Sequence, residues 1–328
     1  MTLPDPANAL SEAAAREAFS AIFEGSCSAE EITAFLIALA DRGETATEIA
    51  AAAQEMRARM IAVDAPANAI DVCGTGGDGS HSLNISTATA LVIAACEIPM
   101  AKHGNRAASS KSGAADTLEA LGLDLAKAAS NAEQNLRDIG IAFFFAPNHH
   151  PALGPLAPIR KAIGRRTIFN LLGPLCNPAK VKRQLIGVAS PDLVETYAEA
   201  ALQLSYDKAM IVSGEEGLDE LSISGPSLVA MISDGAVTIS RITPEDAGLT
   251  RHPAEAIKGG DAEYNAAALK SLLQGEKSAY RDAVLLNSAA ALMVAGEVDS
   301  WEAGVEEAAE ALDKGLANAM LNCWIANQ

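Results

Sequence analysis

Two glycine-rich polar segments stand about twenty residues apart in this chain: Asp71-Val-Cys-Gly-Thr-Gly-Gly-Asp-Gly-Ser80 and Lys102-His-Gly-Asn-Arg-Ala-Ala-Ser-Ser-Lys-Ser-Gly113. Each segment follows a short apolar run and leads into a helical pattern. At such strand-to-helix junctions an α/β sheet presents backbone N–H groups and helix N-termini, which bind phosphate. The sequence therefore predicts a site for a phosphorylated substrate.

The glycines of the first segment remove side chains where a ligand would approach the backbone. A tight turn explains the spacing Gly74-x-Gly76-Gly77 equally well. Asp78 adds an acceptor for a ribose hydroxyl or for a metal-bound water. Further on, Asn84-Ile-Ser-Thr87 gathers small donors where the next helix begins, and one of its two hydroxyl residues could be only an N-cap.

Neither common nucleotide-binding fingerprint fits the first segment. A Walker loop needs a Lys directly after its last glycine, whereas Ser80 follows Gly79. A Rossmann loop needs Gly-x-Gly-x-x-Gly and an acid about twenty residues further on, and Lys102 stands near that position instead. A cation there favours binding of phosphate over binding of an unphosphorylated 2′-hydroxyl.

Hydrophobic periodicity divides the chain into a helical first part and an α/β remainder. The first sixty residues hold three helical patterns, with capping boxes at Ser28-x-x-Glu31 and Thr45-x-x-Glu48. From residue 70 onward strand and helix patterns alternate, with strands expected near 69–73, 99–102, 141–145, 185–189 and 209–212. A hairpin is expected around Asp234-Gly235, and three alanine-rich helices end the chain. This alternation predicts an α/β fold with a mostly parallel central sheet flanked by helices.

Composition limits the classes of protein to which the chain can belong. Its 328 residues, 49% of them hydrophobic, can bury a large core. The five cysteines form no Cys-x-x-Cys spacing, which favours a reducing compartment and no zinc site. The N-terminus has neither a basic region nor a long apolar run, so we expect a cytoplasmic protein without a signal peptide or a membrane span.

Charge is unevenly distributed along the chain. The net charge is −18, yet residues 101–185 carry 12 Lys and Arg against 5 Asp and Glu, and residues 186–328 carry 8 against 23. Arg160-Lys161 and Arg165-Arg166 lie in the basic stretch, which suits an anionic substrate, although a solvated basic face has the same pattern. The acidic overall balance and the scarcity of tyrosine disfavour nucleic acid as a partner.

Six motifs stand in the order and spacing of the anthranilate phosphoribosyltransferase family, which the chain resembles from about residue 10 to its C-terminus. They occupy residues 74–78, 84–87, 102–106, 109–113, 167–174 and 217–221. Pyrimidine nucleoside phosphorylases are more distantly similar, because their second motif reads Lys-x-Ser-Gly-Arg where this chain has His103-Gly104-Asn105. The resemblance implies transfer of the 5-phosphoribosyl group from phosphoribosyl pyrophosphate to anthranilate with release of pyrophosphate, the second step of tryptophan biosynthesis from chorismate.

The same resemblance implies two domains of the nucleoside phosphorylase and phosphoribosyltransferase type. A smaller, all-helical domain would take residues 1–66 and about 152–176, and a large α/β domain would take residues 67–151 and 177–328. The active site is expected between the two domains. A homodimer through the helical domain is also implied, and neither nucleic acid nor a membrane is expected as a partner.

Mg²⁺ is the implied cofactor, as a pair of ions per subunit when substrate is bound, because it stabilises charge on a departing polyanion through hard oxygen ligands. The metal positions of the family correspond to Ser86, Asp219 and Glu220. Taken alone, the adjacent carboxylates follow a strand and a glycine-containing turn, and we expect them on a solvated surface turn. The substrate contacts implied by the resemblance are Gly74, Thr75, Gly77, Asp78, Ser82, Asn84, Ile85, Ser86, Thr87, Lys102, His103, Gly104, Asn105, Arg106, Ala107, Ala108, Ser109, Ser110, Ala114 and Arg160.

Roles follow from the chemistry of these side chains. Lys102 and residues 105–110 would hold the phosphates through charge and backbone donors, and Arg106 fits a structural ion pair as well. Transition-state stabilisation is assigned to Lys102 and the metal, with no single catalytic side chain. Asn105 and Arg160 correspond to anthranilate contacts, where a guanidinium fork suits the carboxylate, although a local acid could take the Arg160 charge instead.

The histidines have weaker assignments. An aromatic amine is neutral at pH 7 and needs little base catalysis, so His103 is interpreted as a hydrogen-bond donor or as a packed loop residue. His149 and His150 are candidates for the pocket wall.

Three positions depart from the family pattern. Ala114 replaces a serine and removes one hydroxyl from the donor site, at a cost on the order of 1 kcal/mol. Leu83 stands where Phe is common, and Leu153-Gly154-Pro155 alters the segment that leads to Arg160. These changes affect the strength of substrate binding and the entrance for anthranilate, and leave the expected reaction unchanged.

Overall fold

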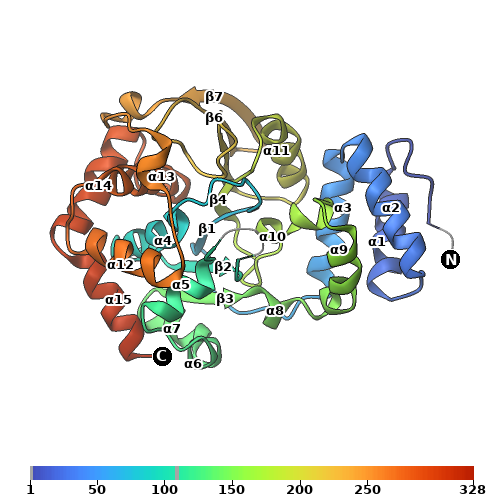
Figure 1. The fold of residues 1–328 in the computed structure, drawn as a ribbon, viewed down its shortest axis with the longest axis horizontal. Helices are drawn as coiled ribbons and strands as arrows, with labels where there is room; N and C mark the ends of the chain where they lie inside the picture. Colours follow the sequence, from blue (N-terminus) through green and yellow to red (C-terminus); the bar gives the residue numbers. More distant parts are fainter. Residues whose placement is uncertain (1–2, 108–110) are drawn as a thin grey trace.

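The computed structural model describes residues 3–107 and 111–328, so Ala108, Ser109 and Ser110, three of the expected donor contacts, lie outside the described residues. Three N-terminal helices, α1 (Glu12–Phe23), α2 (Ala29–Arg42) and α3 (Ala46–Ala58), occupy one end of the molecule (Figure 1). Ser28 and Thr45 form the two expected capping boxes, and Gly43 ends α2 with a φ of 90°.

A seven-stranded sheet in the order β3-β2-β1-β4-β5-β6-β7 forms the larger body. Its first five strands are parallel and its last two are antiparallel, which confirms the predicted α/β fold. The strands are β1 (Ile70–Gly74), β2 (Met100–Gly104), β3 (Ile141–Phe145), β4 (Arg183–Gly187), β5 (Lys208–Gly214), β6 (Ser227–Ser233) and β7 (Ala236–Ile242). Asp234 and Gly235 turn the expected hairpin with left-handed φ values of 52° and 74°.

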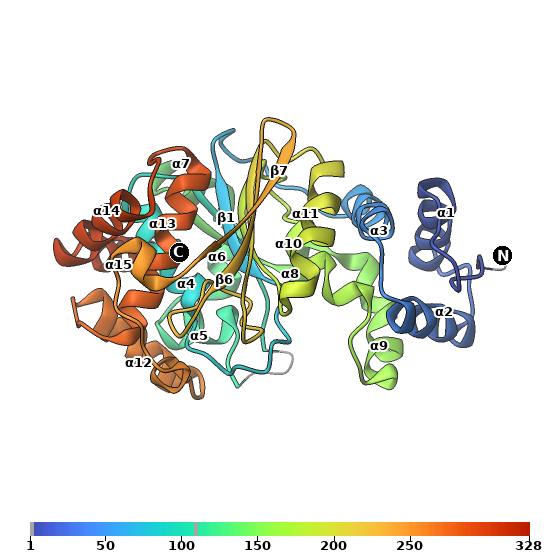
Figure 2. The same ribbon diagram turned by 90° about the horizontal axis from the view of Figure 1, so that it is seen from above.

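Helices cover both faces of this sheet (Figure 2). One face packs through Val72, Met100 and Met210 against the first helix after β1 and the C-terminal helices. The other packs through Ile186 and Ile211 against α11 and the N-terminal helices. The remaining α-helices are α4 (Ile85–Ala95), α5 (Ala114–Ala120), α6 (Leu125–Ser130), α7 (Ala132–Asp138), α8 (Ala146–His149), α9 (Ala157–Ile163), α10 (Leu172–Leu175), α11 (Val194–Gln203), α12 (Ala262–Leu273), α13 (Ala279–Ala295), α14 (Trp301–Asp313) and α15 (Leu316–Ala326).

The chain returns to the N-terminal helices after β3. A 3₁₀ turn at Pro151–Leu156 precedes α9, the helix that carries Arg160. The helix α9 lies beside α2 (Figure 2). Leu156 and Phe169 enter the same apolar cluster as α1 to α3, and the Phe169 ring lies 6.4 Å from the ring of Phe19.

Candidate active site

The loop after β5 brings Asp219 and Glu220 against the segments that follow β1. The backbone N–H of Gly76 donates to Asp219 Oδ2 at 2.7 Å, and that of Ser86 donates to Glu220 Oε1 at 3.1 Å. Glu220 is buried and Asp219 is only partly exposed, so the expectation of a solvated surface turn is wrong. The three residues expected to hold metal therefore meet at the carboxyl end of the sheet.

Two glycines make room for the Asp219 turn. A Cβ atom on Gly187 would lie 1.6 Å from the backbone oxygen of Asp219, and one on Gly74 would lie 2.1 Å from its Oδ2. Any side chain at either position would displace the carboxylates from the glycine segment. The tight-turn explanation also holds here, because Gly76 and Gly77 have φ values of 68° and 80°.

The carboxylates of Asp78, Asp219 and Glu220 repel one another, although they come from two different loops. Burial, followed by the charge of Asp78, raises the pKa of Asp219, and burial together with the charge of Asp219 raises the pKa of Glu220. Asp78 Oδ2 is buried and has no hydrogen-bond partner among the described residues. An excess of negative oxygen atoms in a buried place fits a hard cation such as Mg²⁺.

The described residues offer no cluster of three or more His, Cys, Asp or Glu side chains that would enclose a metal ion by themselves. Mg²⁺ commonly binds to one or two carboxylates and takes its other ligands from water and substrate phosphates. The Asp219 and Glu220 carboxylates with the Ser86 hydroxyl therefore suit an ion that arrives with a phosphorylated substrate.

The helix α4 begins directly beneath these carboxylates. Asn84 occupies its N-cap position without a side-chain cap, so the interpretation of Ser86 or Thr87 as the N-cap is wrong. The Asn84 side chain instead accepts from Thr117 Oγ1 at 2.6 Å and from Asn265 Nδ2 at 2.9 Å. Thr87 Oγ1 is buried and unpartnered within the described chain.

Lys102 is the only lysine that the described part of the chain buries, with 2% of its surface exposed. Its Nζ donates to Val72 O at 2.8 Å and to Ser86 Oγ at 3.4 Å. The ammonium charge also opposes the rise in the pKa of Glu220. Lys102 therefore lies under the proposed metal ligands and contacts Ser86 directly.

His103 lies within β2 and not in a loop, and its side chain is packed. Nδ1 lies 3.2 Å from Gly173 O, and Nε2 lies 3.3 Å from Nε2 of His150. Burial, with a smaller contribution from His150, lowers the pKa of His103 to about 3, so the imidazole is neutral. His150 is buried as well, whereas His149 is partly exposed and places Nδ1 3.0 Å from Ile61 O.

The segment after β2 is held by ion pairs. Arg106 Nη1 donates to Asp116 at 2.9 Å and to Glu119 at 2.5 Å, which confirms its structural alternative. Asn105 is exposed, and its Oδ1 accepts from the backbone N–H of Arg106. The other expected contacts lie nearby: Thr75 and Gly77 between β1 and α4, Ile85 as the first residue of α4, Gly104 as the last residue of β2, Ala107 after it, and Ala114 as the first residue of α5.

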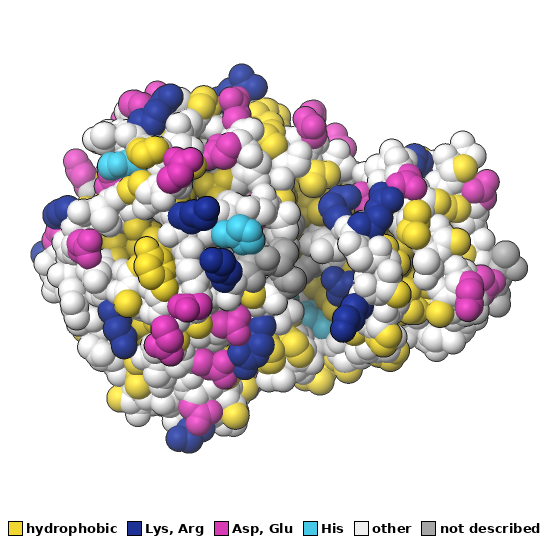
Figure 3. Space-filling view, in the orientation of Figure 1, with side chains coloured by type: hydrophobic (Ala, Val, Ile, Leu, Met, Phe, Trp, Pro, Cys, Tyr) yellow, Lys and Arg dark blue, Asp and Glu magenta, His cyan; other side chains and the backbone are white. Residues whose placement is uncertain are grey.

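Basic side chains gather over α9 beside the hollow between the two bodies (Figure 3). Arg165 and Arg166 bind Asp41 and Glu44 at the end of α2, at 2.5 and 3.0 Å. Arg160 is partly buried, lies 5.7 Å from the centroid of the Phe169 ring, and has no ion pair among residues 3–107 and 111–328. Burial lowers its pKa. The alternative of a local acid as its partner is therefore not supported.

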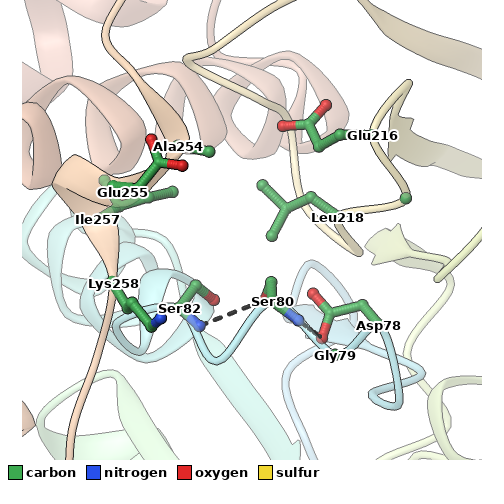
Figure 4. Close-up of a pocket in the computed structure, with 11 residues that line it drawn as sticks. Asp78, Gly79, Ser80, Ser82, Glu216, Leu218, Ala254, Glu255, Ile257 and Lys258 are labelled. Atoms are coloured by element: carbon green, nitrogen blue, oxygen red, sulfur yellow. Dashed lines mark hydrogen bonds between the residues drawn. The ribbon is translucent and has the colours of Figure 1, made fainter.

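A cavity of about 300 Å³ opens on one flank of the glycine segment (Figure 4). Asp78, Ser82 and Lys258 lie on one side of it, and Glu216 and Glu255 lie on the other, with apolar side chains such as Leu218 and Ile257 between them. Its three carboxylates outnumber its one ammonium group, so this cavity disfavours a phosphate. The flank that faces Lys102 and α4 suits the phosphorylated substrate better.

Comparisons with known proteins decide which family this site belongs to. Two family models match the chain: the helical bundle domain of the glycosyl transferase family at residues 6–60, and its α/β domain at residues 66–318. An anthranilate phosphoribosyltransferase from Novosphingobium aromaticivorans is 62% identical over 324 residues, which is 99% of this chain and 98% of that protein. This chain belongs to the anthranilate phosphoribosyltransferase family.

Solved structures of the family agree. The anthranilate phosphoribosyltransferase of Thermus thermophilus is 41% identical with a TM-score of 0.92, over 98% of this chain and 96% of that one. The enzyme from Saccharomyces cerevisiae in complex with PRPP and Mg is 30% identical with a TM-score of 0.89, over 97% and 93%. No helix in the described part of the chain is long and apolar enough to cross a membrane.

The sequence patterns did not mark several residues that shape this site. Asp71, Asn177 and Gln184 form a buried polar cluster, and Gly187 admits the Asp219 turn. One signal was available: Asp71 and Gln184 are polar residues inside otherwise apolar strands, and a buried polar side chain needs partners. The partners themselves come from distant segments.

Proposed function

We propose that this chain transfers the 5-phosphoribosyl group from phosphoribosyl pyrophosphate to the amine of anthranilate, giving N-(5-phosphoribosyl)anthranilate and pyrophosphate in tryptophan biosynthesis. The amine nitrogen forms a bond to C1 while the bond from C1 to pyrophosphate breaks, and the amine proton passes to water. The observation that carries this proposal is the meeting of Asp219 and Glu220 with the glycine segment and with Ser86.

Mg²⁺, when bound, neutralises charge that develops on the departing pyrophosphate. We assign its protein ligands to Ser86, Asp219 and Glu220, and a pair of ions to each subunit with donor present. Asp78 Oδ2 is buried near the Asp219 carboxylate and receives no hydrogen bond from the described residues, which supports a cation at this place. The yeast relative binds PRPP and Mg, which supports the same pairing here.

The phosphoribosyl donor would lie between the glycine segment and the segment after β2. Backbone N–H groups of residues 77–79 suit phosphate oxygens, whereas those of Gly76 and Ser86 already donate to Asp219 and Glu220. Lys102 supplies a fixed positive charge under the pyrophosphate end. Residues 105–110 would contribute backbone donors to the ribose phosphate.

The acceptor would lie between His103, Asn105 and Arg160. The Arg160 guanidinium has no acid partner in the described chain, so it is available to the anthranilate carboxylate in a bidentate arrangement. A neutral His103 does not compete for that carboxylate. Binding by Arg160 would aim the ring amine at C1 of the donor, and this fixed orientation lowers the entropic barrier to transfer.

We assign residues 1–66 and about 152–176 to the helical domain, because α9 packs beside α2 and the Phe169 ring packs against the rings of Phe19 and Phe23 in α1. The remainder forms the donor-binding domain. We propose a homodimer through the helical domain and a cytoplasmic location. Light scattering on the purified chain would measure the oligomeric state directly.

A nucleoside phosphorylase is the competing activity for this fold. Its Lys-x-Ser-Gly-Arg motif has Ser and Gly where this chain has Gly104 and Asn105, and Arg106, at the position of the motif's arginine, is held in ion pairs here. The chemistry of the segment therefore favours the phosphoribosyltransferase.

Loss of anthranilate fluorescence tests the proposal. We expect turnover that requires the protein, phosphoribosyl pyrophosphate and Mg²⁺ together, with release of pyrophosphate. A folded protein that leaves anthranilate unchanged and cleaves thymidine or uridine with phosphate would contradict it.

A further inference from the structure

The two neighbours of β1 pair with it in different ways. Against β4, all five residues of β1 are in register, from Ile70 with Arg183 to Gly74 with Gly187. Against β2, only Ile70 and Met100 are in register. The strands β1 and β2 therefore separate toward their carboxyl ends, where the donor site is proposed.

Side chains replace the missing backbone hydrogen bonds in this gap. Lys102 Nζ donates to Val72 O at 2.8 Å, and the N–H of His103 donates to Asp71 Oδ1 at 3.1 Å. Asn177 Nδ2 donates to Ala101 O and also to Asp71 Oδ2, both at 2.8 Å. We refer to Asp71, Lys102 and Asn177 as the side-chain bridge.

Asp71 is arranged as an ionised carboxylate. It is fully buried, and it accepts from the N–H groups of His103, Asn177 and Gln184. Three donors around one carboxylate leave no acceptor for a proton on it. Burial raises the pKa of Asp71, and the charge of Lys102 is the largest effect that opposes this rise.

Lys102 therefore has negative charge on two sides. Asp71 lies on the inner side, within the sheet, and Glu220 lies on the outer side, with Ser86 between the ammonium and the proposed metal. An unpaired buried charge is costly, so the ammonium needs at least one of these carboxylates.

We propose that Asp71 is a positioning residue of this site. It fixes the separation between β1 and β2 and balances the charge of the buried Lys102 ammonium from the inner side. Glu220 is then available to bind a cation. This inference rests on the proposed metal and donor site. Asp71 contacts no substrate in this account and acts only through Lys102 and the bridge.

The test compares Asp71→Asn with Tyr206→Phe. Asp71→Asn removes the charge while keeping an acceptor for the His103 N–H. Tyr206→Phe breaks the same buried network further away, at the hydrogen bond from Tyr206 to Gln184 Oε1 (2.8 Å), without changing any charge near Lys102. For Asp71→Asn we expect the Mg²⁺ concentration at half-maximal turnover to rise about tenfold, the size expected for one unit charge acting through the protein interior. The KM for anthranilate should stay within about twofold in both variants.

Melting temperatures without metal give a second readout. If Asp71 and Lys102 compensate each other, Asp71→Asn should lower the melting temperature less in a Lys102→Met background than in the wild type, because no ammonium is then left uncompensated. These melting temperatures also test the inference if Asp71→Asn unfolds at the assay temperature. In that case the variant that combines Asp71→Asn with Lys102→Met should melt at a higher temperature than Asp71→Asn alone.

The inference would be overturned if the wild type and Asp71→Asn reached half-maximal turnover at the same Mg²⁺ concentration. It would also be overturned if Asp71→Asn and Tyr206→Phe raised that concentration equally. If the changes in melting temperature caused by Asp71→Asn and Lys102→Met simply added in the double variant, the pairing of these two charges would be overturned. A wild-type protein without Mg²⁺-dependent turnover would instead contradict the proposed function, and the melting cycle would still decide the Asp71 inference.

Discussion

The donor side and the acceptor side of the proposed site differ in how their cations are held. On the donor side, the buried Lys102 ammonium already donates to Val72 O and Ser86 Oγ. On the acceptor side, Arg160 forms no ion pair in the described chain. The cation that would stabilise a leaving polyanion is held within the sheet, whereas the cation that would bind a carboxylate has no acidic partner in the described chain.

This difference predicts different kinetic effects on the two sides. Fixed charges under the pyrophosphate act in the transition state, so their loss should lower kcat. A cation that binds the acceptor carboxylate acts equally before and during the reaction, so its loss should raise KM. Variants on each side can therefore separate the two roles.

The largest effect is expected for Asp219→Asn combined with Glu220→Gln. This variant should lower kcat by roughly a hundredfold to a thousandfold, because it removes the charge that would hold Mg²⁺. Initial rates across a Mg²⁺ series measure this loss. A rate near that of the wild type at ordinary Mg²⁺ would place the metal elsewhere and remove the proposed difference between the two sides.

The same variant should not unfold the protein. Because folding raises the pKa of both carboxylates, their stabilising contribution belongs to low pH and is lost as pH rises through the folded-state values. The neutral variant should therefore lose less stability than the wild type toward alkaline pH. Melting temperatures over a pH series, without metal, measure this control.

Arg160→Ala should have the next largest effect. It should raise the KM for anthranilate about tenfold to a hundredfold, the equivalent of 1.5 to 3 kcal/mol for a charge-assisted contact, and change the KM for the donor little. Lys161→Ala is the matched control, because Lys161 is an exposed cation on the same helix. Should both variants impair only the donor, α9 would be a phosphate-binding surface and the identity of the acceptor would have to be reconsidered.

The smallest effect is expected for Ala114→Ser. Ala114 is the partly exposed first residue of α5, where a hydroxyl could reach the donor phosphates. One additional hydrogen bond of about 1 kcal/mol should lower the KM for the donor roughly fivefold and leave that for anthranilate unchanged. Saturation curves for each substrate at fixed Mg²⁺ give both values, and an unchanged donor KM would show that the serine of other family members is dispensable here.

Local patterns in the sequence predicted most of the fold. Strand periodicity found the five parallel strands, and the dipeptide Asp234-Gly235 found the hairpin, because both depend on neighbouring residues. The return of residues 152–176 to the N-terminal helices leaves no periodic signal. It depends on contacts such as Phe19 with Phe169, which lie far apart in sequence.

The sequence predicted which residues of the proposed site come together better than it predicted how they are held. The motifs grouped Ser86, Asp219 and Glu220, which do meet, although the spacing of the carboxylates also fitted an exposed turn. Their burial depends on Gly187, whose missing side chain admits the Asp219 backbone, and no local rule marks such a close approach. Likewise, the charge pattern found the basic stretch but not Asp41 and Glu44, at and just after the end of α2, which form ion pairs with Arg165 and Arg166.

The central claim is that the carboxylates after β5 and the hydroxyl at the start of α4 hold a metal ion together with the donor. Anomalous diffraction from crystals grown with Mn²⁺ and phosphoribosyl pyrophosphate tests it most directly. We predict an anomalous peak within coordination distance of Ser86 Oγ and of carboxylate oxygens of Asp219 or Glu220, with pyrophosphate oxygens completing its shell. Anomalous density confined to the cavity between Asp78, Glu216 and Glu255, with the donor absent from the Lys102 side, would contradict the account.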